Sequence, residues 1–131
     1  MTFSDLGLAP RLTALLADQG LTAPTPIQTQ AIPHALKGRD VLGLAQTGTG
    51  KTLGFGLPLL QAMGTSRAAP GTAAALILAP TRELAGQIAT ALHGLTEQRG
   101  GPRIALVVGG KSLNAQGVTL ARGTEILVAT P

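Results

Sequence analysis

One segment of eight residues, AQTGTGKT at positions 45–52, constrains the fold of this chain more than any other part of the sequence. It follows a short apolar run at 41–44 that predicts a buried strand, and the residues after it can continue as a helix. A tight loop between a strand and a helix presents free backbone N–H groups, and the helix dipole adds positive potential at the same place. The segment therefore predicts a phosphate-binding loop.

The residue types in this loop suit a nucleotide. Gly48 and Gly50 let the backbone approach a phosphate closely, Lys51 can reach the β- and γ-phosphates, and the Thr52 hydroxyl can bind Mg²⁺. The pattern G-x-x-x-x-G-K-[ST] has Ala45 at its first position, and a small residue there keeps most of the geometry, so the loop is a variant P-loop. A Gly/Thr turn with an unrelated lysine is the alternative, which the strand–loop–helix context disfavours.

Composition sets the remaining limits. The chain has 131 residues, enough for one domain or part of one, and its 44% hydrophobic but 2% aromatic content leaves Ala, Leu, Ile and Val to fill the core. The absence of cysteine excludes disulfides and thiolate metal sites. No secretory signal is present and the longest apolar stretch is too short for a bilayer, so we expect a cytoplasmic protein without a membrane partner. The net charge of +4 permits an anionic partner, but the basic residues are scattered.

Helices and strands are expected to alternate along the chain. The first helix begins near Pro10 and stops at Gly20, and the second begins at Thr25–Pro26. A linker of small residues at 64–72 is expected to be a mobile loop. The P-loop helix is followed by predicted strands at 74–79, 104–108 and 126–129 and predicted helices at 82–98 and 111–121. This order predicts an α/β fold in which helices cover both faces of a parallel sheet.

Further motifs accompany the P-loop. The sequence GLTAPTPIQ occupies 20–28, PTRELA at 80–85 opens a helix after a strand, Gly109–Gly110 ends the next strand, and Thr130–Pro131 ends the one after. In this order and spacing the chain resembles the DEAD-box ATP-dependent RNA helicases, with their Q motif, motif I, motif Ia, GG doublet and the start of motif Ib. Phe3 matches the isolated aromatic residue upstream of the Q motif. The resemblance covers the whole chain and is closest to bacterial RhlE-like members.

The resemblance implies a P-loop NTPase fold of the RecA-like type, with residues 1–131 as the N-terminal part of the ATP-binding domain. It implies ATP and Mg²⁺ as cofactors, with Gln28 recognising adenine by hydrogen bonds and Phe3 by stacking. Lys51 and Thr52 would be catalytic, and Thr52 would bind the metal. The residues that would hold the triphosphate are Gln46, Thr47, Gly48, Thr49, Gly50, Lys51 and Thr52.

The resemblance also implies RNA as the partner, bound along its backbone without sequence specificity. The residues that would line this groove are Pro80, Thr81, Arg82, Glu83, Leu84, Gly109, Gly110 and Thr130. The intact protein would use ATP binding and hydrolysis to unwind short RNA duplexes. Two positions depart from the family's pattern: Leu21 replaces a frequent aromatic residue, and Gly54 stands where Ala or Ser is common.

The family's D-E-A-D carboxylates, its S-A-T motif and its second RecA-like domain are absent from the 131 residues. None of the acidic residues lies in a plausible metal-binding strand; they are Asp5, Asp18, Asp40, Glu83, Glu97 and Glu125. We therefore expect the chain to be a fragment that is incomplete at its C-terminus and inactive alone. We also expect the strand before the P-loop to lack its neighbours in the sheet.

Each motif has a simpler interpretation. The Thr25 and Gln28 pair also forms a capping box, Thr81 suits a helix N-cap beside a solvated Arg82, and Gly109–Gly110 can be an ordinary turn. Phe3 read alone is more often a core residue. For the whole chain, the alternatives are another P-loop protein, such as a nucleotide kinase or a DNA-directed helicase, and a non-catalytic remnant that binds RNA weakly.

Overall fold

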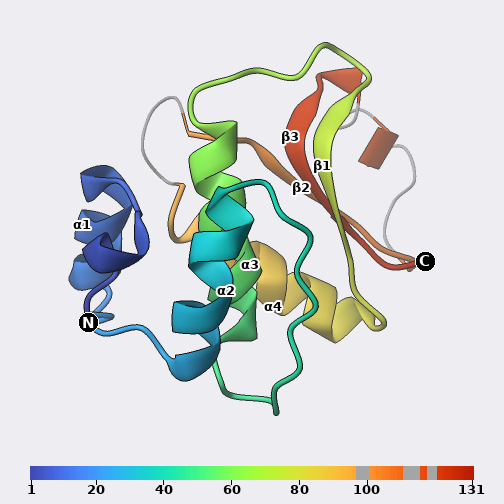
Figure 1. Cartoon of the computed structure of the whole chain (residues 1–131). Coiled ribbons are helices and arrows are strands. Elements are labelled where there is room, and N and C mark those ends of the chain that lie inside the picture. The colour runs from blue at the N-terminus through green and yellow to red at the C-terminus, as the bar shows by residue number, and fades with distance from the viewer. Residues whose placement is uncertain (97–100, 111–115, 118–120) are drawn as a thin grey trace. The chain divides into compact units, whose positions relative to one another are not determined.

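The computed structural model describes residues 1–96, 101–110, 116–117 and 121–131. The chain forms two compact units, Met1–Ala62 and Met63–Pro131, and each is described by itself. The elements are the 3-10 helix η1 (Ser4–Leu6), the helices α1 (Pro10–Asp18), α2 (Pro26–Leu36), α3 (Lys51–Met63) and α4 (Arg82–His93), and the strands β1 (Ala73–Leu78), β2 (Ile104–Val107) and β3 (Thr124–Ala129) (Figure 1).

Helices α1 and α2 begin where the sequence predicts. Each has proline in its first turn, where the missing N–H costs nothing; α1 buries Leu12 and Leu16, and α2 buries Gln28 and Ile32. Helix α1 is followed by Gly20, whose φ of 78° lets the chain turn away after the last helical residues. Pro33 lies inside α2. The predicted positions of the first two helices are confirmed.

Helix α3 is fixed to the start of the chain by one side chain. Gln61 accepts a hydrogen bond from the Ala9 backbone N–H at 2.7 Å and donates one to the Gly7 carbonyl at 3.1 Å. Leu57 and Leu60 of α3 are also buried. The Gln61 side chain therefore ties the far end of the helix that begins at the P-loop to residues 7–9.

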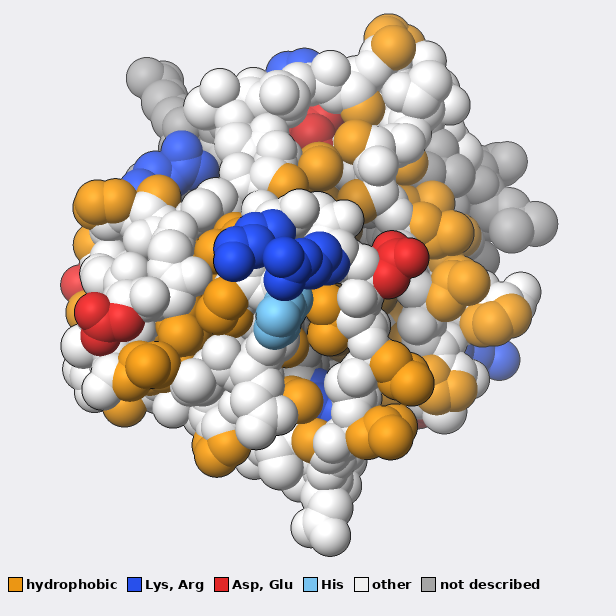
Figure 2. Space-filling view, in the orientation of Figure 1, with side chains coloured by type: hydrophobic (Ala, Val, Ile, Leu, Met, Phe, Trp, Pro, Cys, Tyr) orange, Lys and Arg blue, Asp and Glu red, His pale blue; other side chains and the backbone are white. Residues whose placement is uncertain are grey.

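The strand predicted at 41–44 is not formed. Residues 41–46 have no regular secondary structure, and the side chains of Leu42 and Leu44 are 86% and 84% exposed. A strand requires a partner for its backbone groups, and no strand in the described part of the chain pairs with this segment. The expectation that this segment lacks neighbours in the sheet is confirmed. Hydrophobic side chains accordingly reach the surface in several places on the face drawn in Figure 2.

The second unit contains a parallel sheet with the strand order β1-β3-β2 (Figure 1). The register runs from Ala73 opposite Thr124 to Leu78 opposite Ala129, and from Ile104 opposite Ile126 to Val107 opposite Ala129. Strand β3 is central and almost wholly buried, and α4 packs on β2 and β3 through its buried apolar residues. The predicted α/β fold with a parallel sheet is confirmed, with strand ends shifted by one or two residues.

Two predicted helices are described only in part. Helix α4 ends at His93, and positions 97–98 of the predicted helix lie outside the described residues. The helix predicted at 111–121 lies largely outside them as well, since only 116–117 and 121 are described there. None of the helices in the described part of the chain combines the length and hydropathy needed to cross a membrane.

The linker at 64–72 is anchored, which corrects the expectation of a mobile loop. Glu125, on β3, is only 1% exposed. Its carboxylate accepts hydrogen bonds from the Ala68 N–H and Arg67 Nη1 of the linker, both at 2.8 Å. It also accepts bonds from Arg103, at 2.8 Å from the backbone N–H and 2.7 Å from Nη2. The bond from the Arg103 guanidinium holds the pKa of Glu125 well below its usual range.

Candidate functional site

The P-loop leads directly into α3, which begins at Lys51. Gly48 and Gly50 have φ values of 82° and 87°, a region that side chains other than glycine rarely adopt. The Thr49 hydroxyl donates a hydrogen bond to the Gln46 carbonyl at 2.6 Å, which closes the loop on itself. Gln46, Thr47 and Gly48 are exposed, so the loop is open to a ligand.

Lys51 is held against its own loop. Its Nζ donates a hydrogen bond to the Ala45 carbonyl at 2.6 Å, and no carboxylate in the described residues pairs with it. A backbone carbonyl leaves the positive charge uncompensated, so the ammonium group is available to a phosphate. This role of the Ala45 carbonyl was not predicted, although the place of Ala45 at the start of the P-loop pattern was a usable signal.

Gln28 connects helix α2 to the P-loop. The residue is 3% exposed, its Nε2 donates to the Gly50 carbonyl at 3.0 Å, and its Oε1 accepts from the Thr25 N–H at 2.9 Å. The second bond confirms the helix-capping interpretation for the Gln28 side chain. The Thr25 hydroxyl has no hydrogen-bond partner among the described residues. Both polar ends of Gln28 are thus engaged, and its contact with adenine stays a prediction.

Gly50 is required for a second reason besides its φ value. A Cβ at this position would overlap Nε2 of Gln28 and lie 3.0 Å from the Thr25 hydroxyl. The side chains of Thr25 and Gln28 at the start of α2 therefore lie so close to the P-loop backbone that only a residue without a Cβ fits at position 50.

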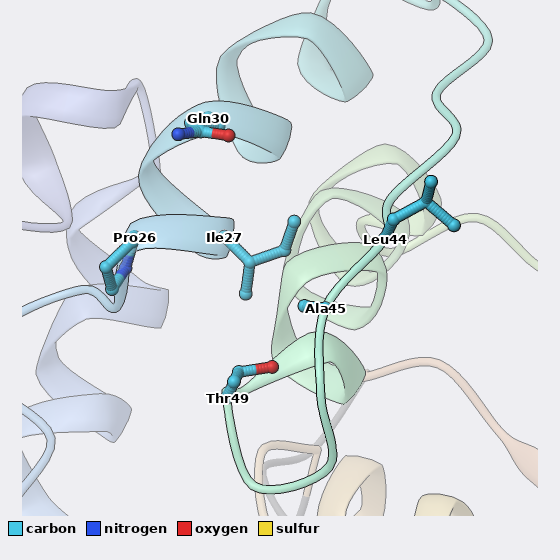
Figure 3. A pocket seen from close by; sticks show the side chains of 6 residues that line it. All are labelled: Pro26, Ile27, Gln30, Leu44, Ala45 and Thr49. Carbon is cyan, nitrogen blue, oxygen red and sulfur yellow. The ribbon is translucent and has the colours of Figure 1, made fainter.

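A pocket of about 200 Å³ lies between the start of α2 and the P-loop (Figure 3). Figure 3 shows Ile27 pointing from the helix toward the loop segment that carries Ala45. The lining residues are Pro26, Ile27, Gln30, Leu44, Ala45 and Thr49. The pocket shares two residues with the P-loop, but neither residue predicted to recognise adenine lines it.

Phe3 lies in the core of the first unit. Its side chain is 4% exposed and the residue immediately precedes η1. The interpretation of Phe3 as a core residue is confirmed for this conformation. Stacking of its ring on adenine stays a prediction that would require the ring to be uncovered.

The predicted RNA-binding residues follow three neighbouring strands of the sheet. Pro80 to Glu83 follow β1, Gly109 and Gly110 follow β2, and Thr130 follows β3. Since the strands are parallel, all three segments lie at the same edge. The Thr130 N–H donates to the Val107 carbonyl at 3.3 Å, which joins the ends of β3 and β2. The structure therefore brings the predicted residues of the second unit together.

Thr81 is the N-cap of α4, because its hydroxyl accepts the Leu84 N–H at 3.1 Å. This confirms the capping interpretation. The Arg82 side chain lies next to the glycine doublet, because a Cβ placed on Gly109 would be 3.9 Å from Arg82 Nε and Nη2. Arg82, Thr81 and Glu83 are all exposed at the start of the helix.

No group of three His, Asp or Glu side chains in the described part of the chain is arranged to hold a metal ion. The Thr52 hydroxyl, in the first turn of α3 and partly exposed, is the residue that sequence reasoning assigns to Mg²⁺. That assignment stays a prediction.

Comparison with known proteins identifies the family. Residues 25–131 match the family described as DEAD/DEAH box helicase. The chain is 50% identical to the ATP-dependent rRNA helicase rrp3 of Emericella nidulans over 99% of its own length and 27% of that protein. It is 46% identical to the ATP-dependent RNA helicase DeaD of Escherichia coli (strain K12), over 99% of its length and 20% of that protein.

Solved structures of helicases are also similar to this chain. The crystal structure of the RNA helicase Prp28 from Chaetomium thermophilum bound to ADP matches with a TM-score of 0.89 and 43% identity, over 99% of this chain and 32% of that one. A DEAD box protein from Methanococcus jannaschii matches with a TM-score of 0.87 and 32% identity, over 100% of this chain and 35% of that one. The present chain thus spans between a fifth and about a third of these proteins. Because the family model matches most of this chain, residues 25–131, the chain belongs to the DEAD/DEAH box helicase family.

Proposed function

We propose that the chain supplies the ATP-binding loop and part of the RNA-binding surface of an ATP-dependent RNA helicase that unwinds short RNA duplexes. The observation that carries the proposal is the hydrogen bond from Gln28 to the Gly50 carbonyl, because it links the Q motif directly to the P-loop. The bond places the residue predicted to recognise the base directly against the loop predicted to hold the phosphates. Family membership argues against the alternative of a nucleotide kinase.

The residues present fit a nucleoside triphosphate with Mg²⁺. Positive φ values at Gly48 and Gly50 leave the loop backbone uncovered, and Lys51 can exchange its bond to the Ala45 carbonyl for the β- and γ-phosphates. The Thr52 hydroxyl would be a ligand of the metal, which when bound supplies charge neutralisation on the phosphates. The similar structure of Prp28 contains ADP, which supports an adenine nucleotide here.

RNA would bind at the carboxyl edge of the sheet in the second unit. The N-terminus of α4, the Arg82 guanidinium and the exposed glycine backbone at 109–110 are groups that suit phosphates. Such contacts fix the position of a strand without reading its bases, so binding would be independent of RNA sequence. The relatives named RNA helicases support this partner.

The nucleotide site is tested by titration calorimetry of ATP into the parent chain, Lys51→Ala and Lys37→Ala. Loss of charge-assisted bonds to phosphate should weaken ATP binding by Lys51→Ala about tenfold or more. Lys37 is an exposed residue at the end of α2 with no side-chain partner among the described residues, so it controls for loss of one positive charge. Equal affinities of the parent and Lys51→Ala would rule out the P-loop assignment.

A further inference from the structure

The Arg82 guanidinium occupies the space above the glycine doublet that follows β2. A Cβ on Gly109 would be in ordinary contact with it, at 3.9 Å from Nε. A Cβ on Gly110 would overlap Nη1 and lie 3.4 Å from Cζ. Arg82 begins α4 after β1, whereas the doublet follows β2, and β3 lies between these two strands. The Arg82 side chain therefore reaches across the edge of the sheet into space that a side chain on Gly110 would fill.

Arg82 is exposed, and its guanidinium makes no ion pair or hydrogen bond with any residue in the described part of the chain. In the same unit, Arg67 and Arg103 differ, because both bond to the Glu125 carboxylate. The donors of Arg82 therefore lie beside the glycine doublet and are open to an anionic ligand.

We propose that Gly110, with Gly109 beside it, is a positioning residue that acts on RNA through Arg82: the absence of its side chain lets the guanidinium lie flat at the carboxyl edge, ready for a backbone phosphate. This inference rests on the proposed binding of RNA at that edge. A Cβ at Gly110 would exclude the rotamer in which the guanidinium lies over the doublet, so Arg82 would have to meet a phosphate from another position. The doublet then contributes to affinity even where its own backbone makes no contact with RNA.

The test measures binding of a short fluorescein-labelled oligouridylate by fluorescence anisotropy. Gly110→Ala should weaken binding roughly tenfold, since the displaced guanidinium loses a charge-assisted bond to phosphate. Gly71→Ala is the matched control: Gly71 has a φ of 76°, close to the 78° of Gly110, but a Cβ there meets nothing within 4 Å. It imposes the same backbone strain without a collision and should leave RNA binding unchanged.

Two further variants separate positioning from strain. Gly110→Asn tolerates a positive φ but carries a Cβ, so it should lose affinity as Gly110→Ala does, and it carries the test if the alanine variant does not fold. In the Arg82→Ala background, adding Gly110→Ala should cost no further affinity, because the group that it displaces is gone. Both Arg82→Ala and Gly110→Ala should reduce the slope of log affinity against log salt by roughly 0.7.

Each other outcome has a distinct meaning. A Gly110→Asn variant that binds as tightly as the parent shows that glycine is needed only for its φ value, and it overturns the inference. The inference is also overturned if Gly110→Ala lowers RNA affinity equally in the parent and in the Arg82→Ala background, because the glycine would then act independently of Arg82. If the parent binds RNA and Arg82→Ala binds equally well, the inference is wrong while RNA binding stands. If the parent does not bind, the RNA part of the proposed function fails and the inference with it.

Discussion

Replacement of Glu125 by glutamine should destabilise the chain by an amount that depends on pH. The two carboxylate oxygens accept different backbone N–H groups, Oε1 from Arg103 and Oε2 from Ala68. Glutamine offers only one oxygen, so its amide N–H₂ must face one of these donors and leave it unpaired. A buried unpaired donor costs about 1–3 kcal/mol. The side chains of Arg67 and Arg103 are 46% and 39% exposed, so their guanidinium groups can turn toward water and add little to the destabilisation.

The sign of the pH dependence follows from the lowered pKa of Glu125 in the folded chain, which the Arg103 guanidinium mainly causes. A carboxylate with a depressed pKa contributes stability above its unfolded pKa, near 4.5, and loses it as pH falls toward the folded value. At 1.36 kcal/mol per pH unit, the parent loses roughly 2 kcal/mol of this contribution between pH 4.5 and pH 3. Glutamine does not titrate, so the stability gap between the two proteins should close over that range.

Urea unfolding followed by far-UV circular dichroism measures both effects, since the chain has no Trp or Tyr for fluorescence. With a slope of about 2 kcal/mol per molar urea, Glu125→Gln should lower the midpoint at pH 7 by about 0.5–1.5 M. Asp40→Asn removes an exposed carboxylate without a partner among the described residues and should leave the midpoint unchanged. Equal midpoints for the parent and Glu125→Gln at pH 7, or a gap of the same size at pH 3, would refute the reasoning.

Three further outcomes are expected. Gly50→Ala should weaken ATP binding about tenfold or more in calorimetry, because its Cβ would overlap Gln28. The control Gly54→Ala, whose added Cβ meets nothing within 4 Å, should bind ATP as the parent does. Equal ATP affinities of the parent and Gly50→Ala would contradict this prediction. Gln28→Ala should erase a preference for ATP over GTP in the same assay, and a variant that still discriminates makes Gln28 a structural residue only. Amide hydrogen exchange should show weak protection at 41–45, where no strand is formed, and strong protection there would mean that the segment pairs in solution.

The sequence predicted those parts of the fold that depend on local signals. Proline in the first turn and glycine after the last turn marked α1, and Thr25–Pro26 marked the start of α2. The apolar run at 41–44 has the same local character as β1 and β2, yet it forms no strand. Whether such a run pairs depends on partners far away in sequence, so its composition was insufficient.

Contacts between distant side chains were beyond local reasoning. The hydrogen bond from Gln28 to the Gly50 carbonyl joins two motifs that the sequence identified separately. It could not be predicted from the sequence, because only the folded chain shows that the two motifs are close. Glu125 was set aside as an acidic residue without a role. One signal was present: Glu125 directly precedes the predicted apolar strand at 126–129, and a charged residue that is buried needs a partner, although the sequence does not show that Arg67 and Arg103 provide it.

The strand order also governs when the sheet can assemble during synthesis. Among the strands that the structure describes, β1 and β2 each pair with β3, which is the last of the three to be synthesised. Ala73 pairs with Thr124, so the ribosome must add the residues from 73 to 124 before β1 meets its partner. At about 5–20 residues per second, that interval lasts roughly 3–10 s. For that time the apolar segment AAALIL has not met its partner strand, and unpaired segments of this kind are prone to aggregate until they join a sheet.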